Sequence, residues 1–276
     1  MRDPGTPSGE SWDETAWSAF ADELAAWRAA GRPAAFWWRD DDAGPSDGHL
    51  DRLIGLAEKT GVPLGLAVVP AWLEPGVAAA LRAAPANLAV LQHGWAHVNH
   101  EPVPAPGTDR LRQAECGDAR PAAVVLAEIE QGWQRLDATF ADRVLPVFVP
   151  PWNRVAPAVH TALPGLGYRA LSTFGPRNGA GPAARLGILN CHVDPVLWRD
   201  GRRFAGATAT LDRLRGELTA RRRGQTDPDE PIGILTHHRA MALDQWMFLE
   251  EWLGRLRRHP AATFPSIASL MAHSIR

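Results

Sequence analysis

The sequence predicts an α/β protein that folds as one domain, a distorted (β/α)7-type barrel. Short apolar segments of strand length alternate with longer segments of helical periodicity, a pattern typical of βαβ connections and a parallel sheet. The 276 residues suffice for one barrel of roughly 250 residues. An open doubly wound sheet is the alternative, but no glycine-rich turn of the dinucleotide- or phosphate-binding type supports it.

The first expected element is a helix within residues 1–33, which we expect to pack on a catalytic barrel formed by residues 34–276. Ser11 and Glu14 have the spacing of a capping box. Gly31 and the proline that soon follows it end the helix. The large apolar residues at helical spacing are Trp17, Phe20, Leu24 and Trp27.

Seven apolar runs predict strands, and helical patterns lie between them. The predicted strands cover residues 34–40, 64–69, 88–92, 144–149, 168–173, 187–191 and 232–236. The predicted helices after the first cover 50–59, 74–84, 122–140, 155–163, 208–222 and 243–256. Loops 101–121 and 175–184 follow the third and fifth strands, so we expect them at the catalytic rim and expect loop 223–231 on the opposite face.

Composition excludes several classes of protein. With 45% hydrophobic and 22% charged residues, the chain is expected to be globular rather than disordered. A net charge of -2 gives no reason to expect nucleic acid as a partner. No apolar run approaches a membrane span, and the first residues lack the apolar core of a signal peptide, so we expect a cytoplasmic protein. The two cysteines fit no metal or redox motif, and the oligomeric state stays open.

Polar residues follow the predicted strands at the points where the apolar runs stop. The triplet at residues 40–42 is Asp-Asp-Asp, and His93 and His97 follow the third strand. Carboxylates and imidazoles suit a divalent metal of the zinc type, and the two histidines would share a face if their segment were helical. Since neighbouring parallel strands end at one rim, the pattern predicts a metal-dependent hydrolase.

Three more polar clusters lie after later strands, at residues 150–154, 192–194 and 237–238. Trp95 lies between the two histidines and Trp152 lies in the cluster at residues 150–154, and the flat apolar face of a tryptophan suits a sugar ring. Five polar clusters on one predicted rim favour a functional site over solvated loops.

These motifs resemble those of the polysaccharide deacetylases, the family 4 carbohydrate esterases with the NodB-homology domain, of which this chain would be a divergent branch. The resemblance covers residues 34 to about 240. In the family's order, the matching elements are Asp41-Asp42, His93 to His97, Val149-Pro150-Pro151-Trp152, Asp194 with Trp198, and Leu235-Thr236-His237.

The resemblance implies roles for individual residues. Asp41 would be the general base and His237 the general acid that protonates the leaving amine. Because the triplet leaves the register open, Asp40 and Asp41 could exchange roles. The implied ligands of a divalent metal, with zinc expected, are Asp42, His93 and His97.

The arginine of the family's third motif falls on Val149 in this chain. We expect Arg154 to take over its support of the base, with Arg39 as the second candidate. The expected substrate-binding residues are Trp95, Pro151, Trp152, Asn153, Asp194, Trp198 and His238.

The resemblance therefore implies a hydrolase that removes an acetyl or other acyl group from an N-acetylated sugar or oligosaccharide, acting on amide bonds other than peptide bonds. Two alternatives stay open. The same site could hydrolyse a non-sugar amide or an ester. A catalytically weak barrel could instead bind a carbohydrate or a metal in a structural or regulatory role. This alternative is considered because Val149 replaces the arginine of the family's third motif.

Overall fold

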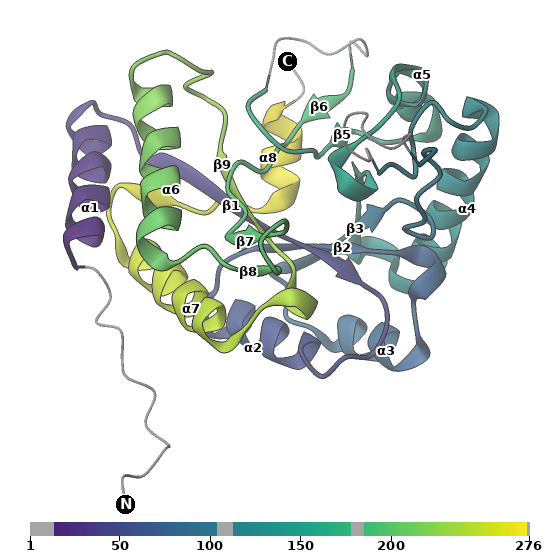
Figure 1. Cartoon of the computed structure of the whole chain (residues 1–276), viewed down its shortest axis with the longest axis horizontal. Helices are drawn as coiled ribbons and strands as arrows, with labels where there is room; N and C mark the ends of the chain where they lie inside the picture. The colour runs from purple at the N-terminus through teal and green to yellow at the C-terminus, as the bar shows by residue number, and fades with distance from the viewer. Residues whose placement is uncertain (1–13, 104–112, 178–184, 275–276) are drawn as a thin grey trace, which may run out of the picture.

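Seven parallel strands form the barrel sheet, in the spatial order β9-β1-β2-β3-β4-β5-β6 (Figure 1). A short eighth strand, β10, pairs in parallel with the start of β1. The computed structural model describes residues 14–103, 113–177 and 185–274, so the expected capping residue Ser11 lies outside the described part. All seven predicted strands are present: β1 Ala34–Ala43, β2 Leu64–Val68, β3 Leu88–His93, β4 Val144–Val149, β5 Ala170–Leu171, β6 Gly187–Ile188 and β9 Ile232–Thr236.

The sheet curls until its two edges meet. In the segment after β6, the His192 amide donates to the Gly233 carbonyl oxygen at 2.7 Å. The Leu235 amide of β9 donates back to the Val193 carbonyl oxygen at 2.8 Å. These bonds join the edges, and the predicted distorted (β/α)7-type barrel is confirmed.

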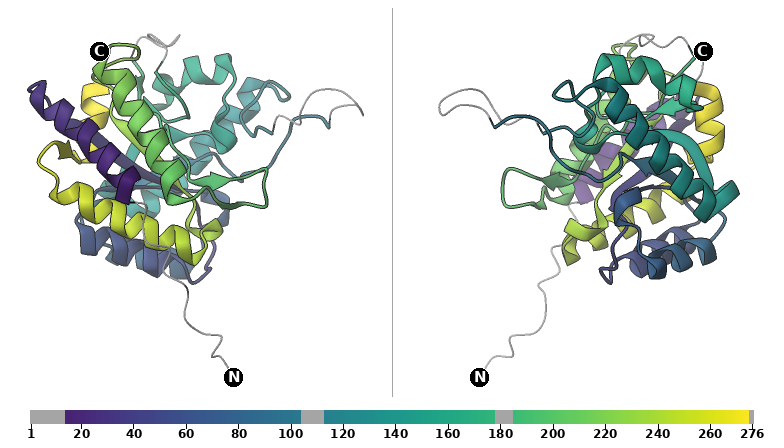
Figure 2. Two further views of the ribbon diagram at one scale, coloured as in Figure 1. Left: turned by 60° about the vertical axis from the view of Figure 1, so that its left-hand side comes forward. Right: turned by 90° about the vertical axis from the view of Figure 1, so that its right-hand side faces the viewer.

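Helices surround the barrel (Figures 1 and 2). The α-helices in the described residues are α1 Glu14–Ala29, α2 Leu50–Thr60, α3 Pro75–Ala83, α4 Ala122–Phe140, α5 Pro157–Ala162, α6 Ala207–Arg222, α7 Leu243–Arg258 and α8 Ile267–Ser274. Short 3-10 helices are η1 Pro70–Trp72, η2 Ala141–Arg143, η3 Pro151–Asn153, η4 Leu163–Leu166 and η5 His238–Ala240. No helix in the described ranges has the length and apolarity needed to cross a bilayer.

Sequence reasoning missed a few small elements. They are the antiparallel hairpin of β7 Val196–Leu197 and β8 Arg203–Phe204, the strand β10 Ala262–Thr263, and α8. Two-residue strands are too short to show periodicity, which explains why the pattern did not reveal them.

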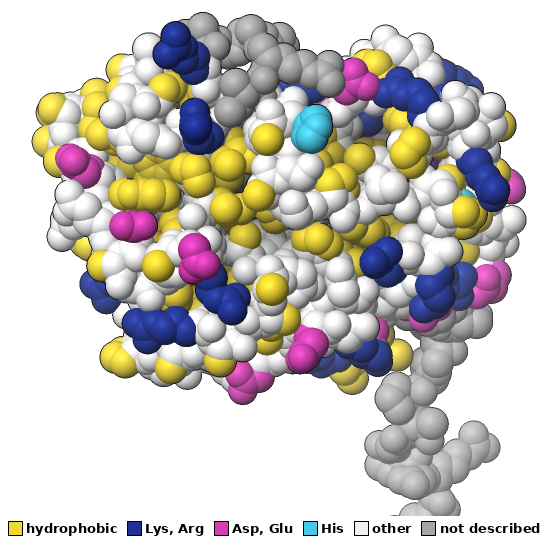
Figure 3. All heavy atoms as spheres, turned by 180° about the vertical axis from the view of Figure 1, so that it is seen from behind, with side chains coloured by type: hydrophobic (Ala, Val, Ile, Leu, Met, Phe, Trp, Pro, Cys, Tyr) yellow, Lys and Arg dark blue, Asp and Glu magenta, His cyan; other side chains and the backbone are white. Residues whose placement is uncertain are grey.

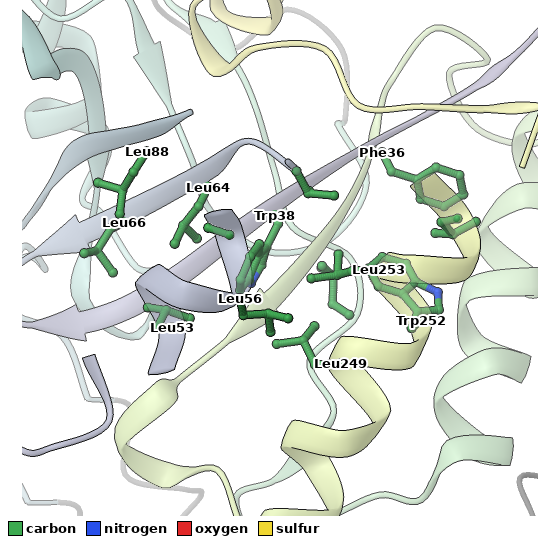
Figure 4. Close-up of a cluster of buried hydrophobic side chains, with 14 of the residues drawn as sticks. Phe36, Trp38, Leu53, Leu56, Leu64, Leu66, Leu88, Leu249, Trp252 and Leu253 are labelled. Atoms are coloured by element: carbon green, nitrogen blue, oxygen red, sulfur yellow. The ribbon is translucent and has the colours of Figure 1, made fainter. Parts of the chain in front are cut away.

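The outer face of the sheet packs against helices in a large hydrophobic cluster (Figure 4). Phe36 and Trp38 of β1 lie in it and are fully buried. Trp252 of α7 meets the Phe36 ring edge-on, with the ring centroids 6.0 Å apart. Burying side chains of this size stabilises the fold by roughly 1.5–3 kcal/mol each. This cluster therefore fixes β1, the strand that carries the acidic triplet.

The inside of the barrel is filled by a second cluster centred on Trp37. Gly233 makes room for its ring, because a Cβ there would lie 2.4 Å from Trp37 Nε1. Ile267 and Leu270 of α8 belong to the same cluster, so this helix covers the end of the barrel where the strands begin. The opposite end, where the strands finish, remains available for a site.

The N-terminal helix α1 lies on the outside of the barrel beside α6 (Figure 2). Trp27 Nε1 donates to the Leu218 carbonyl oxygen at 3.1 Å across this contact. On the rear of the molecule, hydrophobic side chains gather in patches across the middle of the surface, and charged side chains lie mostly around them (Figure 3).

Candidate metal centre

The alternation of side chains along β1 sorts the acidic triplet between two faces. Trp37 lies in the inner cluster and Trp38 in the outer one. With a period of two, Arg39 and Asp41 share the inner face, and Asp40 shares the outer one. The alternation ends at Asp42, which has a φ of 72°, where the register with β2 shifts. This left-handed residue turns its carboxylate toward the end of β3.

Three predicted metal ligands come together at this place. Asp42 Oδ1 lies 3.2 Å from His93 Nε2 and 3.3 Å from His97 Nε2. One donor atom from each residue lies within 4.8 Å of the other two. His93 is buried, while the side chain of His97 is 16% exposed, so the cluster opens on one side.

The segment from His93 to His97 is not helical, so the two histidines do not share a helix face. It turns through left-handed backbone at Gly94, with φ of 56°, and at His97, with φ of 55°. Gly94 is required there, because a Cβ would lie 2.0 Å from Glu115 Oε2 and 2.6 Å from Pro151 Cδ. The two imidazoles therefore converge through a tight loop rather than through one helix face.

The donor set fits a divalent cation. His93 Nδ1 donates to the Val149 carbonyl oxygen at 2.9 Å, which leaves the Nε2 lone pair of a neutral ring facing Asp42. Asp42 Oδ1 is buried and has no hydrogen-bond partner among the described residues. Acceptors that face each other at this distance repel unless a positive charge lies between them. Carboxylate with two imidazoles is a set that zinc accepts.

The pKa values of these residues follow from the same crowding. Burial would raise the pKa of Asp42, but the neighbouring His93, His237 and His97 lower it well below its usual range. Burial opposes a charge on His93, yet the Asp41 and Asp42 carboxylates raise its pKa overall. Burial and the nearby His93 lower the pKa of His97. The pKa of His93 is thus raised and that of its neighbour His97 is lowered, so protonation of both rings at once is disfavoured.

The cation that contacts Asp41 is Arg39, so the expectation for Arg154 is corrected. Arg39 Nη2 donates to Asp41 Oδ2 at 2.9 Å and to Asn153 Oδ1 at 2.7 Å. Arg39 Nη1 donates to Ser172 Oγ at 2.7 Å. Arg154 is exposed, and its Nη1 donates to the Gln113 carbonyl oxygen. The period-two spacing of residues 39 and 41 on one strand was the signal that favoured Arg39.

His237 lies at the end of β9, beside two residues of the β6–α6 segment. Its Nδ1 is 3.7 Å from Asp194 Oδ2, and its ring meets the Trp198 indole edge-on at 4.5 Å between centroids. Trp198 Nε1 donates to the same Asp194 oxygen at 2.7 Å. Burial is the main reason that the pKa of Asp194 is raised. The structure thus gathers these three predicted residues into one group.

Of the other expected substrate-binding residues, Trp95, Pro151 and Trp152 lie around the loop between the two histidines, and Asn153 lies beside Arg39. The Trp152 ring packs on His97 with 4.3 Å between centroids, and Trp95 is half-buried in the loop that joins the two histidines. Pro151 is buried against Gly94. Asn153 accepts a hydrogen bond from Arg39 and so contacts the cation that pairs with Asp41.

His238 contradicts its expected role in substrate binding. Its side chain is 1% exposed and lies between the carboxylates of Asp40 and Asp47. The side-chain alternation of β1 places Asp40 on the outer face of the sheet. Because His238 pairs with Asp40, it lies on that face too, away from the rim where a ligand would enter.

Sequence reasoning also missed residues that hold the site together. Glu115 is buried, and its carboxylate accepts hydrogen bonds from the Trp95 and Ala96 amides at 3.1 and 2.7 Å. The Trp72 ring lies 5.4 Å from the His97 ring. Glu115 lies in an irregular loop and Trp72 follows β2, and neither belongs to a sequence motif that would have identified it as part of the site.

The loops lie only partly where we expected. Residues 113–117 of loop 101–121 reach the rim through Glu115, while 104–112 lie outside the described residues. Loop 175–184 was expected at the catalytic rim, and its described start contradicts this. The Arg177 amide donates to Glu230, which precedes β9 and therefore lies at the opposite end of the barrel.

Loop 223–231 lies at the opposite end as predicted. Arg32, just before β1, donates to the Pro228 carbonyl oxygen at 3.2 Å. His192 belongs to this end too, with its Nε2 3.2 Å from Glu230 Oε1, and not to the rim where its cluster was expected.

Comparison with known proteins identifies the fold. No model of a known protein family matches the chain. No curated protein sequence matches it either.

Solved structures do match. A protein assigned as a polysaccharide deacetylase from Mycobacterium smegmatis has a TM-score of 0.61 at 16% identity, covering 88% of this chain and 91% of that one. Puue allantoinase has a TM-score of 0.58 at 12% identity, covering 87% and 89%. A mutant of a family 4 carbohydrate esterase pseudoenzyme, with restored enzymatic activity, has a TM-score of 0.53 at 13% identity, covering 87% and 68%.

These likenesses show that the chain has the fold of the polysaccharide deacetylases, as the sequence motifs predicted.

Proposed function

We propose that this protein is a metal-dependent hydrolase that removes an acetyl or similar acyl group from the nitrogen of an N-acylated sugar or oligosaccharide. The observation that carries the proposal is the cluster of Asp42, His93 and His97 at the open end of a polysaccharide deacetylase fold. Asp41 and His237 in the same rim supply a carboxylate and an imidazole for proton transfer.

Asp42, His93 and His97 would hold a divalent ion, for which we propose zinc. Such an ion polarises an amide carbonyl and makes water a better nucleophile at neutral pH. The buried, unpartnered Asp42 Oδ1 and the lone pair that His93 directs at it support this assignment.

We assign Asp41 as the general base. Arg39 holds Asp41 Oδ2 at 2.9 Å, while Asp41 Oδ1 is buried and has no hydrogen-bond partner in the described part of the chain. A carboxylate that is oriented through one oxygen can accept the proton of the attacking water on the other. Arg39 and Asn153 are therefore positioning residues, and Asp40 is not the base because it pairs with His238 on the outer face.

We assign His237 as the general acid. Breaking the carbon–nitrogen bond requires a proton on the departing nitrogen, and an imidazole can donate one near neutral pH. The Asp194 carboxylate lies 3.7 Å from the ring nitrogen Nδ1, and the Trp198 indole contacts the ring edge-on. A sugar ring would meet the half-buried Trp152 and the exposed Trp198 at the rim.

The test is metal analysis of the purified protein, followed by acetate release from a panel of N-acetylated sugars. We expect one divalent ion per chain and its loss in His93→Ala with His97→Ala. Asp41→Asn and His237→Gln should lower turnover by roughly 10²–10⁴-fold while keeping the metal. Stoichiometric metal in the double variant would refute the site, and loss of metal in Asp41→Asn would show that the ligand and base are wrongly assigned.

A second candidate is hydrolysis of a non-sugar amide, which the likeness to an allantoinase favours. The same panel decides between the two when allantoin and simple N-acyl amines are included. Release of product from these compounds alone would establish the second function. Metal binding without hydrolysis of any compound would indicate a catalytically weak barrel.

A further inference from the structure

A buried group of hydrogen bonds joins the ends of β1 and β9 on the outer face of the barrel. The Asp40 carboxylate accepts from Thr236 Oγ1 at 2.6 Å and from the His238 amide at 3.0 Å. His238 Nδ1 donates to the other oxygen of Asp40. Asp40 is fully buried and His238 is 1% exposed, so water does not compete for these bonds.

The arrangement matters because Thr236 and His238 are the two chain neighbours of His237. Both are tied to one carboxylate on β1, so the backbone on each side of His237 is fixed to that strand. The ring of His237 itself is held loosely, since its 3.7 Å distance to Asp194 exceeds that of a hydrogen bond. The position of the ring thus depends on the anchored backbone together with the edge-on contact to Trp198.

We infer that Asp40 and His238 are positioning residues that hold the His237 imidazole at the reaction site. The inference rests on the proposed function of His237 as general acid. Asp40 is the additional first aspartate of the triplet, which the Asp-Asp pair of the resemblance leaves without a role.

The charges of this group balance. His238 Nε2 lies 3.4 Å from Asp47 Oδ2, so each nitrogen of the ring faces a carboxylate. Burial disfavours the imidazolium, but the carboxylates of Asp40 and Asp47 raise the pKa of His238 overall. Arg239 Nε, 3.2 Å from Asp47 Oδ2, supplies the second positive charge.

The same group reaches the metal site from its other side. Arg239 lies over the Trp72 ring at 5.6 Å, and that ring lies 5.4 Å from the His97 ring. Loops after β1, β2 and β9 are therefore linked around the rim by Asp47 and Arg239, in addition to the direct anchor at Asp40.

A buried ion pair can also act only on stability, and the molecule offers a matched control for that case. His192 and Glu230 form a second buried histidine–carboxylate contact, at 3.2 Å, at the opposite end of the barrel. Asp40→Asn and Glu230→Gln each replace a buried carboxylate that faces a histidine by the corresponding amide. A purely structural role predicts similar effects of both changes.

The experiment compares Asp40→Asn, Glu230→Gln and the wild type, each with metal bound, by kinetics on the N-acetylated sugar that the wild type hydrolyses best. Misplacing a catalytic group by about 1 Å costs on the order of 10²-fold in rate, so we expect Asp40→Asn to lose that much kcat with KM and metal content unchanged. Glu230→Gln should lose stability but keep kcat. Equal kcat in Asp40→Asn and the wild type, or equal losses in both variants, would overturn the inference.

A conservative pair guards against failure of Asp40→Asn to fold. His238→Asn keeps a donor near the position of Nδ1, whereas His238→Ala removes it, so the asparagine variant should recover part of the kcat that the alanine variant loses. Equal kcat in the two variants would contradict positioning through Asp40.

A measurement without substrate separates this inference from the proposed function. The ring signals of His237 in nitrogen-15 NMR, assigned with His237→Gln, should broaden or shift in Asp40→Asn and stay unchanged in Glu230→Gln. If the wild type hydrolyses nothing, the proposed function fails, and the ring signals still decide whether Asp40 positions His237. Unchanged ring signals in Asp40→Asn would refute the positioning.

Discussion

Replacing Arg39 by methionine tests the assignment of the cation that supports Asp41. Arg39 is fully buried and donates hydrogen bonds to Asp41, Asn153 and Ser172. Methionine fills much of the same space but donates none of these bonds. Asp41, whose side chain is 3% exposed, would then be a buried carboxylate without its counter-ion.

The expected loss is large. Removing one partner of a buried ion pair costs about 3–5 kcal/mol, because the remaining charge is left uncompensated. For a chain of this size each kcal/mol lowers Tm by roughly 2–4 °C, so Arg39→Met should lower Tm by roughly 6–20 °C. Arg154→Met is the matched control, and as a surface change it should cost less than about 0.5 kcal/mol.

The assay is urea unfolding of both variants and the wild type in the presence of a chelator, so that metal binding does not contribute. A double-mutant cycle with Asp41→Asn adds the direct coupling between the two residues, expected at roughly 0.5–3 kcal/mol. Equal stability of Arg39→Met and Arg154→Met, or no coupling in the cycle, would refute the pairing.

Three further predictions concern other parts of the molecule. Shortening loop 223–231 should leave kcat and KM unchanged, because it lies beside Arg32 at the end of the barrel opposite the site; a large change in KM would contradict this placement. Burial raises the pKa of the Cys191 thiol to about 12, so iodoacetamide at neutral pH should label it only after unfolding, and rapid labelling of the native protein would disprove its burial. The folded pKa of His238 is raised above an unfolded value of about 6.5, so its contribution to stability is full below that pH and is lost as pH rises through the folded pKa. The difference in unfolding free energy between the wild type and His238→Gln should therefore shrink as pH rises from about 6.5, and a growing difference would show that the sign is wrong.

The motifs predicted much of the metal site because the chemistry lies at strand ends. Apolar runs marked where β1 and β3 stop, and parallel strands carry their ends to one rim. That rule brought the acidic triplet and the two histidines to one rim, and the ligand set Asp42, His93 and His97 implied by the family resemblance meets there. The conformation between the histidines did not follow, because Gly94 and His97 adopt left-handed backbone that the spacing of an HxxxH motif does not reveal.

The sequence by itself determined the order of the seven main strands and of the helices between them, and the residue types available at each strand end. Only the tertiary structure decided which polar groups pair: Arg39 rather than Arg154 with Asp41, and His238 with Asp40. Pairing between distant segments depends on sheet register and on the direction of each side chain across the barrel. Those quantities are set when the strands pack together, because local periodicity places a residue on a face but does not say which residue of another strand it will meet.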